Sequence, residues 1–282
     1  MGLTSLEAWR EAVCGIVPED AIPDHPDFGT LYPWRALAVH ATSGRFQRRV
    51  DAARRLIDDT LVRLPPEQWR LALSGGKDSL ALAALLSGRG VRAFVVGDDC
   101  PFPGEEEHTE GVASRLGLPL DRVRPSVSIA AMLPAAGLVG DLHSRRSEIA
   151  RVAFYEPIAE YQRTEDFSGT FWGLRAEESR GRRMRRRTSG LLYRCAAGWR
   201  CAPVGDWSAL DVHALLASRG IPIAPPYLCV DPGMDPLSIR TDWWFAGGFA
   251  ASIGGHYVWL RRWWPVLWDR AVEIDPRVAE IS

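Results

Sequence analysis

Lysine is almost absent from this chain of 282 residues. Of its 34 basic residues only Lys77 is a lysine, and all the others are arginines. The formal net charge is −1, which excludes the uniformly positive field that draws a whole protein to nucleic acid or to anionic membranes. No apolar run approaches the ~20 residues of a transmembrane helix, so we expect no membrane contact. The first nine residues lack the basic and apolar regions of a secretory signal, so we expect a cytoplasmic protein.

Cysteine is sparse and follows no pattern. The five cysteines are Cys14, Cys100, Cys195, Cys201 and Cys229, and no two form a C-x-x-C pair. An odd number without a secretory signal argues against a disulfide framework. The last three offer three ligands, whereas zinc and iron–sulfur sites usually take four. We therefore favour small, semi-buried residues over a metal site for these three cysteines.

A strand, a glycine turn and a helix follow one another between residues 69 and 86. Residues 69–73 are apolar and predict a buried strand, residues 74–76 form a Ser-Gly-Gly turn, and residues 78–86 predict a helix. Glycines let the backbone approach an anion, and the free N–H groups and dipole of a helix start attract it. The spacing of a Walker A loop is absent. The candidate phosphate ligands are Ser74, Gly75, Gly76, Lys77, Asp78 and Ser79.

Lys77 supplies a mobile positive charge to this turn. Because it stands at the mouth of a glycine turn, we expect its side chain to be exposed. Changing it to alanine should then remove most nucleotide-dependent activity and leave the fold intact.

The sequence Ser-Gly-Gly-Lys-Asp-Ser resembles the pyrophosphate loop of the adenine nucleotide α-hydrolase superfamily, the N-type ATP pyrophosphatases. Two later stretches resemble its phosphoadenylyl-sulfate (PAPS) reductase branch: Gly-Leu-Arg-Ala-Glu-Glu-Ser-Arg at 173–180, and Ala-Pro-Val-Gly-Asp-Trp at 202–207 followed by Asp211-Val212. The three matches stand in order within residues 69–228. The resemblance implies an α/β fold, a doubly wound and mainly parallel sheet of the Rossmann-like (HUP-like) α/β/α type. It also implies an adenine nucleotide, ATP or PAPS, as the ligand.

The chain divides into three predicted segments. Residues 1–66 form a loop-rich N-terminal extension with helices at 5–13 and 45–64, residues 67–228 form the nucleotide-binding domain, and residues 229–282 form a tryptophan-rich C-terminal subdomain. In the central segment, strands at 69–73, 91–97, 121–125 and 170–174 alternate with helices, which predicts a doubly wound parallel sheet. We further expect a long helix at 144–161, a loop at 180–188, a hairpin over 191–201 and a helix at 208–218. A tail helix over 258–272 is broken or kinked at Pro265.

Carboxylates and an arginine follow the predicted strands at the edge where ligands of parallel sheets bind. Asp98 and Asp99 end the second strand, and Arg175 follows the fourth. Asp78, or Asp98 with Asp99, offers the oxygen ligands that Mg²⁺ prefers, and we name Asp78 and Asp98 as the metal ligands.

Arg175 completes a predicted catalytic set with Lys77 and Asp78. Its guanidinium can grip two phosphate oxygens at once. Gly173 and Glu178 join the predicted nucleotide site, and Glu177 and Glu178 either orient Arg175, contact a ribose, or belong to a solvated helix start. Trp207 either closes the site or lies in the core, and we favour the core.

Six arginines crowd the predicted loop that follows. As a phosphate-binding patch they would contact a nucleic-acid substrate or the phosphates of the nucleotide, and the alternative is a solvated loop. They are Arg180, Arg182, Arg183, Arg185, Arg186 and Arg187.

The favoured function is cleavage of ATP between its α and β phosphates to adenylate an acceptor, for sulfur transfer to a nucleic acid or a small molecule. One alternative is a PAPS or adenylyl-sulfate reductase with a relocated cysteine, because the Glu-Cys-Gly-Leu/Ile-His segment of those reductases is missing. The other is a non-catalytic nucleotide-binding assembly module. Six of the 12 tryptophans lie in the tail, where they bind a second copy or another protein, or pack against one another.

Overall fold

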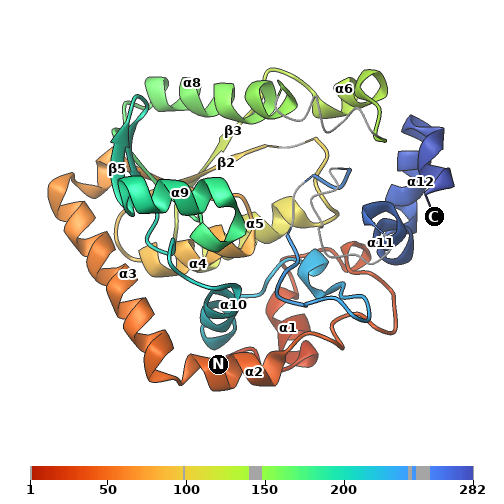
Figure 1. Ribbon diagram of the computed structural model, residues 1–282, viewed down its shortest axis with the longest axis horizontal. Helices are drawn as coiled ribbons and strands as arrows, with labels where there is room; N and C mark the ends of the chain where they lie inside the picture. Colours follow the sequence, from red (N-terminus) through yellow and green to blue (C-terminus); the bar gives the residue numbers. More distant parts are fainter. Residues whose placement is uncertain (1, 98, 140–147, 241–242, 246–254, 282) are drawn as a thin grey trace.

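The computed structural model describes residues 2–97, 99–139, 148–240, 243–245 and 255–281 (Figure 1). The predicted metal ligand Asp98 and the first four residues of the helix predicted at 144–161 lie outside the described residues.

A six-stranded sheet forms the centre of the molecule, with the strand order β3-β2-β1-β4-β6-β5. Five strands are parallel, and β5 runs antiparallel to β6 at one edge. The doubly wound, mainly parallel fold and the hairpin are therefore confirmed. The strands are β1 (Trp69–Ala72), β2 (Arg92–Val96), β3 (Leu120–Val123), β4 (Gly169–Trp172), β5 (Leu192–Cys195) and β6 (Gly198–Cys201).

Helices cover both faces of the sheet, with α8 on one side and α4 and α5 on the other (Figure 1). The N-terminal and central helices are α1 (Leu6–Val13), α2 (Trp34–Ala41), α3 (Gly44–Arg63), α4 (Lys77–Leu86), α5 (Glu105–Arg115), α6 (Ile129–Ala136), α8 (Glu156–Thr164), α9 (Arg180–Ser189) and α10 (Ala209–Ser218). The tail holds α11 (His256–Trp263) and α12 (Pro265–Ile274), which meet at the predicted proline break. Short helical turns are η1 (Glu19–Ala21), η2 (Pro66–Gln68), η3 (Arg151–Tyr155), η4 (Ala176–Glu178), η5 (Pro225–Leu228) and η6 (Pro276–Glu280).

The strand order changes direction between β1 and β4. The chain moves from β1 to β2 and β3 on one side of the sheet, and β4 then pairs with β1 on the other side, with Ala72 opposite Trp172. In such sheets the crevice outside the carboxyl ends of the two central strands is the usual place for a ligand. The turn at 74–76 follows β1 and Arg175 follows β4, so the topology brings both to this crevice.

Three local predictions were wrong or incomplete. Residues 180–189 form helix α9, because Ser179 accepts a hydrogen bond from the N–H of Arg182 as an N-cap and arginine is a good helix former. Helix α2 lies between the two helices predicted in the N-terminal extension, where the sequence had predicted a loop-rich segment. The described part of the predicted helix at 144–161 contains the π-helical turn η3 before α8.

The hydrophobic core runs through all three predicted segments, from Leu3 to Val278. Trp9 of α1 donates from Nε1 to the carbonyl of Ile223 over 2.9 Å, and Trp259 of α11 donates to the carbonyl of Cys229 over 2.8 Å. Four tail tryptophans, Trp244, Trp259, Trp263 and Trp264, are buried. These buried side chains contribute to the stability of the fold.

Among the described residues, we find no helix with the length and hydrophobicity of a membrane span.

Asp211 joins the N-terminal helices to the sheet domain. Its carboxylate is 0% exposed and accepts hydrogen bonds from Ser208 at the start of α10, from His40 of α2 over 2.9 Å, and from Arg49 of α3. Burial opposes its ionisation, but the hydrogen bonds of Ser208 and His40 and the charge of Arg49 lower the pKa of Asp211 below its usual value.

We expect Asp211→Ala to lower the free energy of unfolding by about 3 kcal/mol, because His40 and Arg49 then lose a buried partner. The exposed ion pair of Asp206 provides the control, and Asp206→Ala should cost under about 1 kcal/mol. Since the folded pKa of Asp211 is lowered, its contribution is present above the unfolded pKa of about 4 and is lost as the pH falls below it. Urea denaturation at neutral and acidic pH measures both effects. Equal losses in the two variants would contradict this assignment.

Candidate functional site

The turn after β1 leaves backbone N–H groups unpaired at the start of α4. Gly75 has φ +73°, in the left-handed region, and Gly76 caps α4 without a side-chain hydrogen bond. Ser79 stabilises the turn, since its Oγ donates to the carbonyl of Gly76 over 2.9 Å and accepts from the N–H of Ser74 over 3.2 Å. In the described part of the chain, the N–H groups of Gly75, Gly76 and Asp78 have no acceptor. Unpaired N–H groups at a helix start are the donors that a bound anion would use.

Lys77 is buried, and the prediction of an exposed side chain was wrong. It is only 2% exposed, its Nζ lies 3.0 Å from Oδ2 of Asp78, and it lies 5.4 Å from the ring centroid of Tyr227. The carboxylate of Asp78 and the ring of Tyr227 thus hold the lysine side chain inside the protein. Its removal would therefore also affect the stability of the fold.

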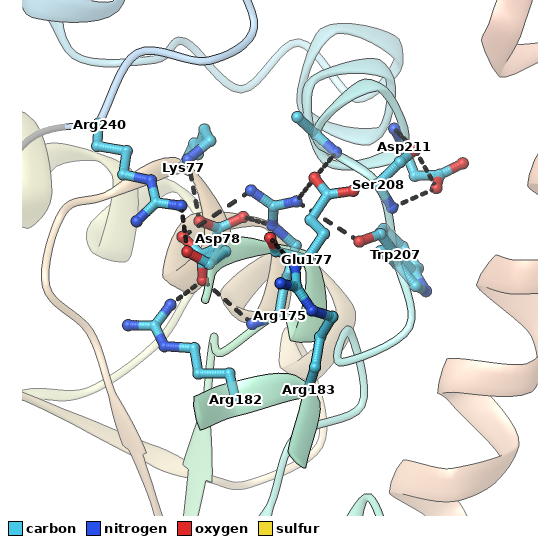
Figure 2. A network of polar contacts seen from close by, with 12 residues as sticks. Lys77, Asp78, Arg175, Glu177, Arg182, Arg183, Trp207, Ser208, Asp211 and Arg240 are labelled. Carbon is cyan, nitrogen blue, oxygen red and sulfur yellow. Dashed lines mark hydrogen bonds and ion pairs between the residues drawn. The ribbon is translucent and has the colours of Figure 1, made fainter. Parts of the chain in front are cut away.

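Arg175 approaches the same carboxylate from β4. Its Nε lies 2.5 Å from Oδ1 of Asp78, and the guanidinium also pairs with Glu177 and lies 3.9 Å from Oε1 of Glu178 (Figure 2). Burial opposes ionisation of Asp78, but the charges of Lys77 and Arg175 outweigh it, so the pKa of Asp78 lies below its usual value. The site therefore holds two buried cations on one carboxylate.

Gly173 permits this close approach of β4 to α4. A Cβ on Gly173 would lie 2.6 Å from the carbonyl carbon of Asp78 and from the backbone nitrogen of Ser79. These neighbours are backbone atoms, which cannot move aside as a flexible side chain would. The glycine is thus required for Arg175 to reach Asp78.

The segment of the third sequence motif, residues 202–212, holds the two residues that follow Arg175. Glu177 accepts a hydrogen bond from the N–H of Ala209 over 2.7 Å, and the N–H of Ala176 donates to the carbonyl of Gly205 over 2.8 Å. Trp207 is buried and packs against Phe46 at a centroid distance of 6.2 Å, which confirms the core interpretation. The three sequence motifs meet at one place.

Two contributors to the site were missed by sequence reasoning. The hydroxyl of Tyr227, in η5, accepts the N–H of Lys77 over 3.1 Å. Arg240, from the C-terminal segment, is exposed and donates to the carbonyl of Glu178 over 2.7 Å (Figure 2). Both lie far from the turn in sequence, and no local pattern connects them to it.

His213 of α10 lies close to the same charges. Its Nδ1 is 2.5 Å from the hydroxyl of Tyr32, and burial together with the charge of Lys77 lowers the pKa of His213 to about 3. Burial also raises the pKa of Tyr32. Both side chains are therefore neutral, and Nε2 of His213 has no hydrogen-bond partner among the described residues.

The described residues do not fit a magnesium site made of protein ligands. Both oxygens of Asp78 accept from cations, and Asp99 accepts the N–H groups of Ile129 and Ala130 at the start of α6. No group of three acidic, histidine or cysteine side chains within the described ranges could hold a metal ion. A magnesium ion arriving with a nucleotide would depend on phosphate oxygens and water.

Of the last three cysteines, two are buried and one lies at the far end of the sheet from the crevice. Burial raises the pKa of Cys201 to about 12 and raises that of Cys229 as well. Cys195 is exposed, but it lies beside Gly198 in the hairpin turn, at the amino end of β6 and opposite the crevice.

We expect Gly173→Ala to lower the free energy of unfolding by roughly 2 kcal/mol, because the new methyl group overlaps backbone atoms of α4. Gly181→Ala in α9 is the matched control. Its Cβ would come no closer than 4.0 Å to the nearest atom, Oγ of Ser179, and alanine favours the helix by about 1 kcal/mol. Urea denaturation followed by tryptophan fluorescence compares the two variants, and equal stabilities would show that β4 and α4 are not in tight contact.

Comparisons with known proteins identify the family of the central domain. The family model of the phosphoadenosine phosphosulfate reductase domain matches residues 68–228, and no curated protein sequence matches the chain. The crystal structure of phosphoadenylyl-sulfate (PAPS) reductase from Candida auris in a phosphate complex is similar, with a TM-score of 0.52, 15% identity, and coverage of 68% of this chain and 88% of that one.

Two further solved structures match more weakly. The NH3-dependent NAD synthetase of Campylobacter jejuni has a TM-score of 0.41, with 18% identity over 61% of this chain and 72% of that one. The NMN synthetase of Francisella tularensis has a TM-score of 0.44, with 15% identity over 63% of this chain and 71% of that one. The family model covers more than half of the sequence, and the chain therefore belongs to the phosphoadenosine phosphosulfate reductase domain family.

Proposed function

We propose that this protein binds ATP at the turn of residues 74–79 and cleaves it between the α and β phosphates to adenylate an acceptor. The observation that carries the proposal is the pair of buried cations, Lys77 and Arg175, that converge on Asp78 beside unpaired backbone N–H groups. Such an arrangement suits a polyanion with several oxygens, and the family membership supports an adenine nucleotide.

The reaction requires the site to stabilise pyrophosphate as it leaves. A nucleophile of the acceptor attacks the α phosphorus, the bond from that phosphorus to the bridging oxygen breaks, and the electron pair leaves with pyrophosphate. Lys77 and the N–H groups of Gly75 and Gly76 would bind this leaving group. Asp78 pairs with both Lys77 and Arg175 in the absence of nucleotide, and the greater negative charge of the phosphates would compete for both cations.

The remaining site residues have positioning roles in this proposal. Glu177 and Glu178 hold the guanidinium of Arg175, and Gly173 lets it approach the turn. Ser79 fixes the turn, and the exposed Ser74 offers a hydroxyl at its entrance.

A sulfonucleotide reductase is the less supported alternative. That chemistry needs a thiolate near the bound nucleotide. Cys201 and Cys229 are buried with raised pKa values, and Cys195 lies at the opposite end of β6. Formation of sulfite from PAPS or adenylyl sulfate with a thiol donor, lost in Cys229→Ser or Cys201→Ser, would favour the reductase.

We expect Lys77→Met to weaken ATP binding at least about tenfold and to remove pyrophosphate release, since it keeps the buried stem and removes the charge. Lys77→Arg should recover part of the binding, because its fork is bulkier than an ammonium. Isothermal titration calorimetry with ATP and Mg²⁺ measures the affinity of each variant. The control is Arg89→Met, which removes the cation of an exposed ion pair with Asp58. Thermal melts identify any variant that fails to fold.

Two outcomes would contradict the proposal. The wild-type protein would show no heat of ATP binding, or folded Lys77→Met would bind ATP as tightly as the wild type.

A further inference from the structure

Helix α9 is attached to the protein by charge and not by apolar packing. None of its residues is buried. Arg182 pairs with Glu178, and Arg186 forms two hydrogen bonds with Asp206, of 2.7 and 2.6 Å. Because these arginines are four residues apart, they lie on the same side of the helix, which faces Glu178 and Asp206.

Three other arginines of α9, Arg180, Arg183 and Arg187, form an outward surface that we call the arginine face. Arg180 and Arg187 make no side-chain hydrogen bond or ion pair with any described residue, and Arg183 donates only to the carbonyl of Glu177 over 3.3 Å. The three are spaced for one side of a helix and are exposed, and Arg185 is exposed on another side. The helix contains no acidic residue that could neutralise them.

This charge distribution is unfavourable for the isolated protein. Arg183 and Arg187 are like charges four residues apart, which costs about 0.2–0.5 kcal/mol. Arg180 and Arg182 lie in the first turn, where the helix dipole disfavours cations. A sequence that breaks local electrostatic rules in this way marks a functional surface, and a bound polyanion would relieve the repulsion.

The arginine face begins at the candidate site. Glu178 contacts Arg175 and Arg182, and Ser179 alone separates it from α9. Arg240 adds a further exposed cation beside Glu178 (Figure 2). Positive charge therefore extends from the mouth of the site along the roughly 15 Å of the helix.

We propose that the arginine face binds the phosphodiester backbone of a single-stranded nucleic acid and so brings the acceptor to the site; this rests on the proposed function. Guanidinium groups bind phosphate oxygens in pairs, and spaced arginines suit a repeating anion. Met184 is the only apolar side chain among the described residues of α9, whereas a protein interface would require an apolar centre. A single strand can bend one base into the crevice without the cost of unpairing it.

The double variant Arg183→Ala/Arg187→Ala tests the proposal in the full-length protein. Fluorescence anisotropy with a labelled single-stranded oligonucleotide, as DNA and as RNA, measures affinity over a range of salt concentrations. We expect a loss of about tenfold in affinity and a decrease of about 1 to 2 in the slope of log K against log salt. Arg48→Ala/Arg55→Ala, which removes two exposed arginines of α3, is the control of equal charge and should retain binding.

The outcomes separate this inference from the proposed function. ATP binding of the Arg183/Arg187 double variant should equal that of the wild type, so a failure of the wild type to bind ATP would overturn the proposed function alone. Equal losses of affinity in the two double variants, or no binding of the oligonucleotides, would contradict the proposal that the arginine face binds nucleic acid. If polyglutamate competes as effectively as unlabelled nucleic acid, the ligand of the face is an acidic protein. If a duplex binds more tightly than a single strand, the ligand is not single-stranded.

Discussion

The carboxylate of Asp78 between Lys77 and Arg175 is the interaction on which the site depends. Two cations and one anion are removed from water together, and each would be costly to bury alone. The carboxylate makes burial of both cations acceptable, and Glu177 pairs with the guanidinium of Arg175 as well. The turn thus holds its cations in fixed positions before any ligand arrives, which reduces the reorganisation that binding requires.

This arrangement constrains elements far from the charges. β4 must come close enough to α4 that only glycine fits at position 173, and strand order alone places Arg175 beside the turn. The hydroxyl of Tyr227 also fixes the backbone of Lys77, because it accepts the hydrogen bond of the lysine N–H. The N-terminal helices reach the same region through α10, where Asp211 joins them to the domain. The extensions therefore support the geometry of the site through a continuous core.

The fold and the centre of the site were predictable because they follow from local patterns and topology. Apolar runs followed by glycine turns identify parallel strands, and the carboxyl ends of such strands share an edge, which brought Arg175 to the turn. The burial of Lys77 was not predictable, because it depends on the ion pair with Asp78 and on a tyrosine ring contributed from 150 residues away. Helix α9 was missed because its residues have no apolar periodicity, and its docking depends on carboxylates of other segments, Glu178 and Asp206.

The scarcity of lysine gives the protein an unusual chemical property. Its only side-chain amine is 2% exposed and held in an ion pair, so amine-directed acylating reagents meet no accessible lysine on the surface. A reagent can reach Lys77 only when the pair with Asp78 opens. The rate of covalent labelling at this residue would therefore report how often the turn opens, with no background from other lysines.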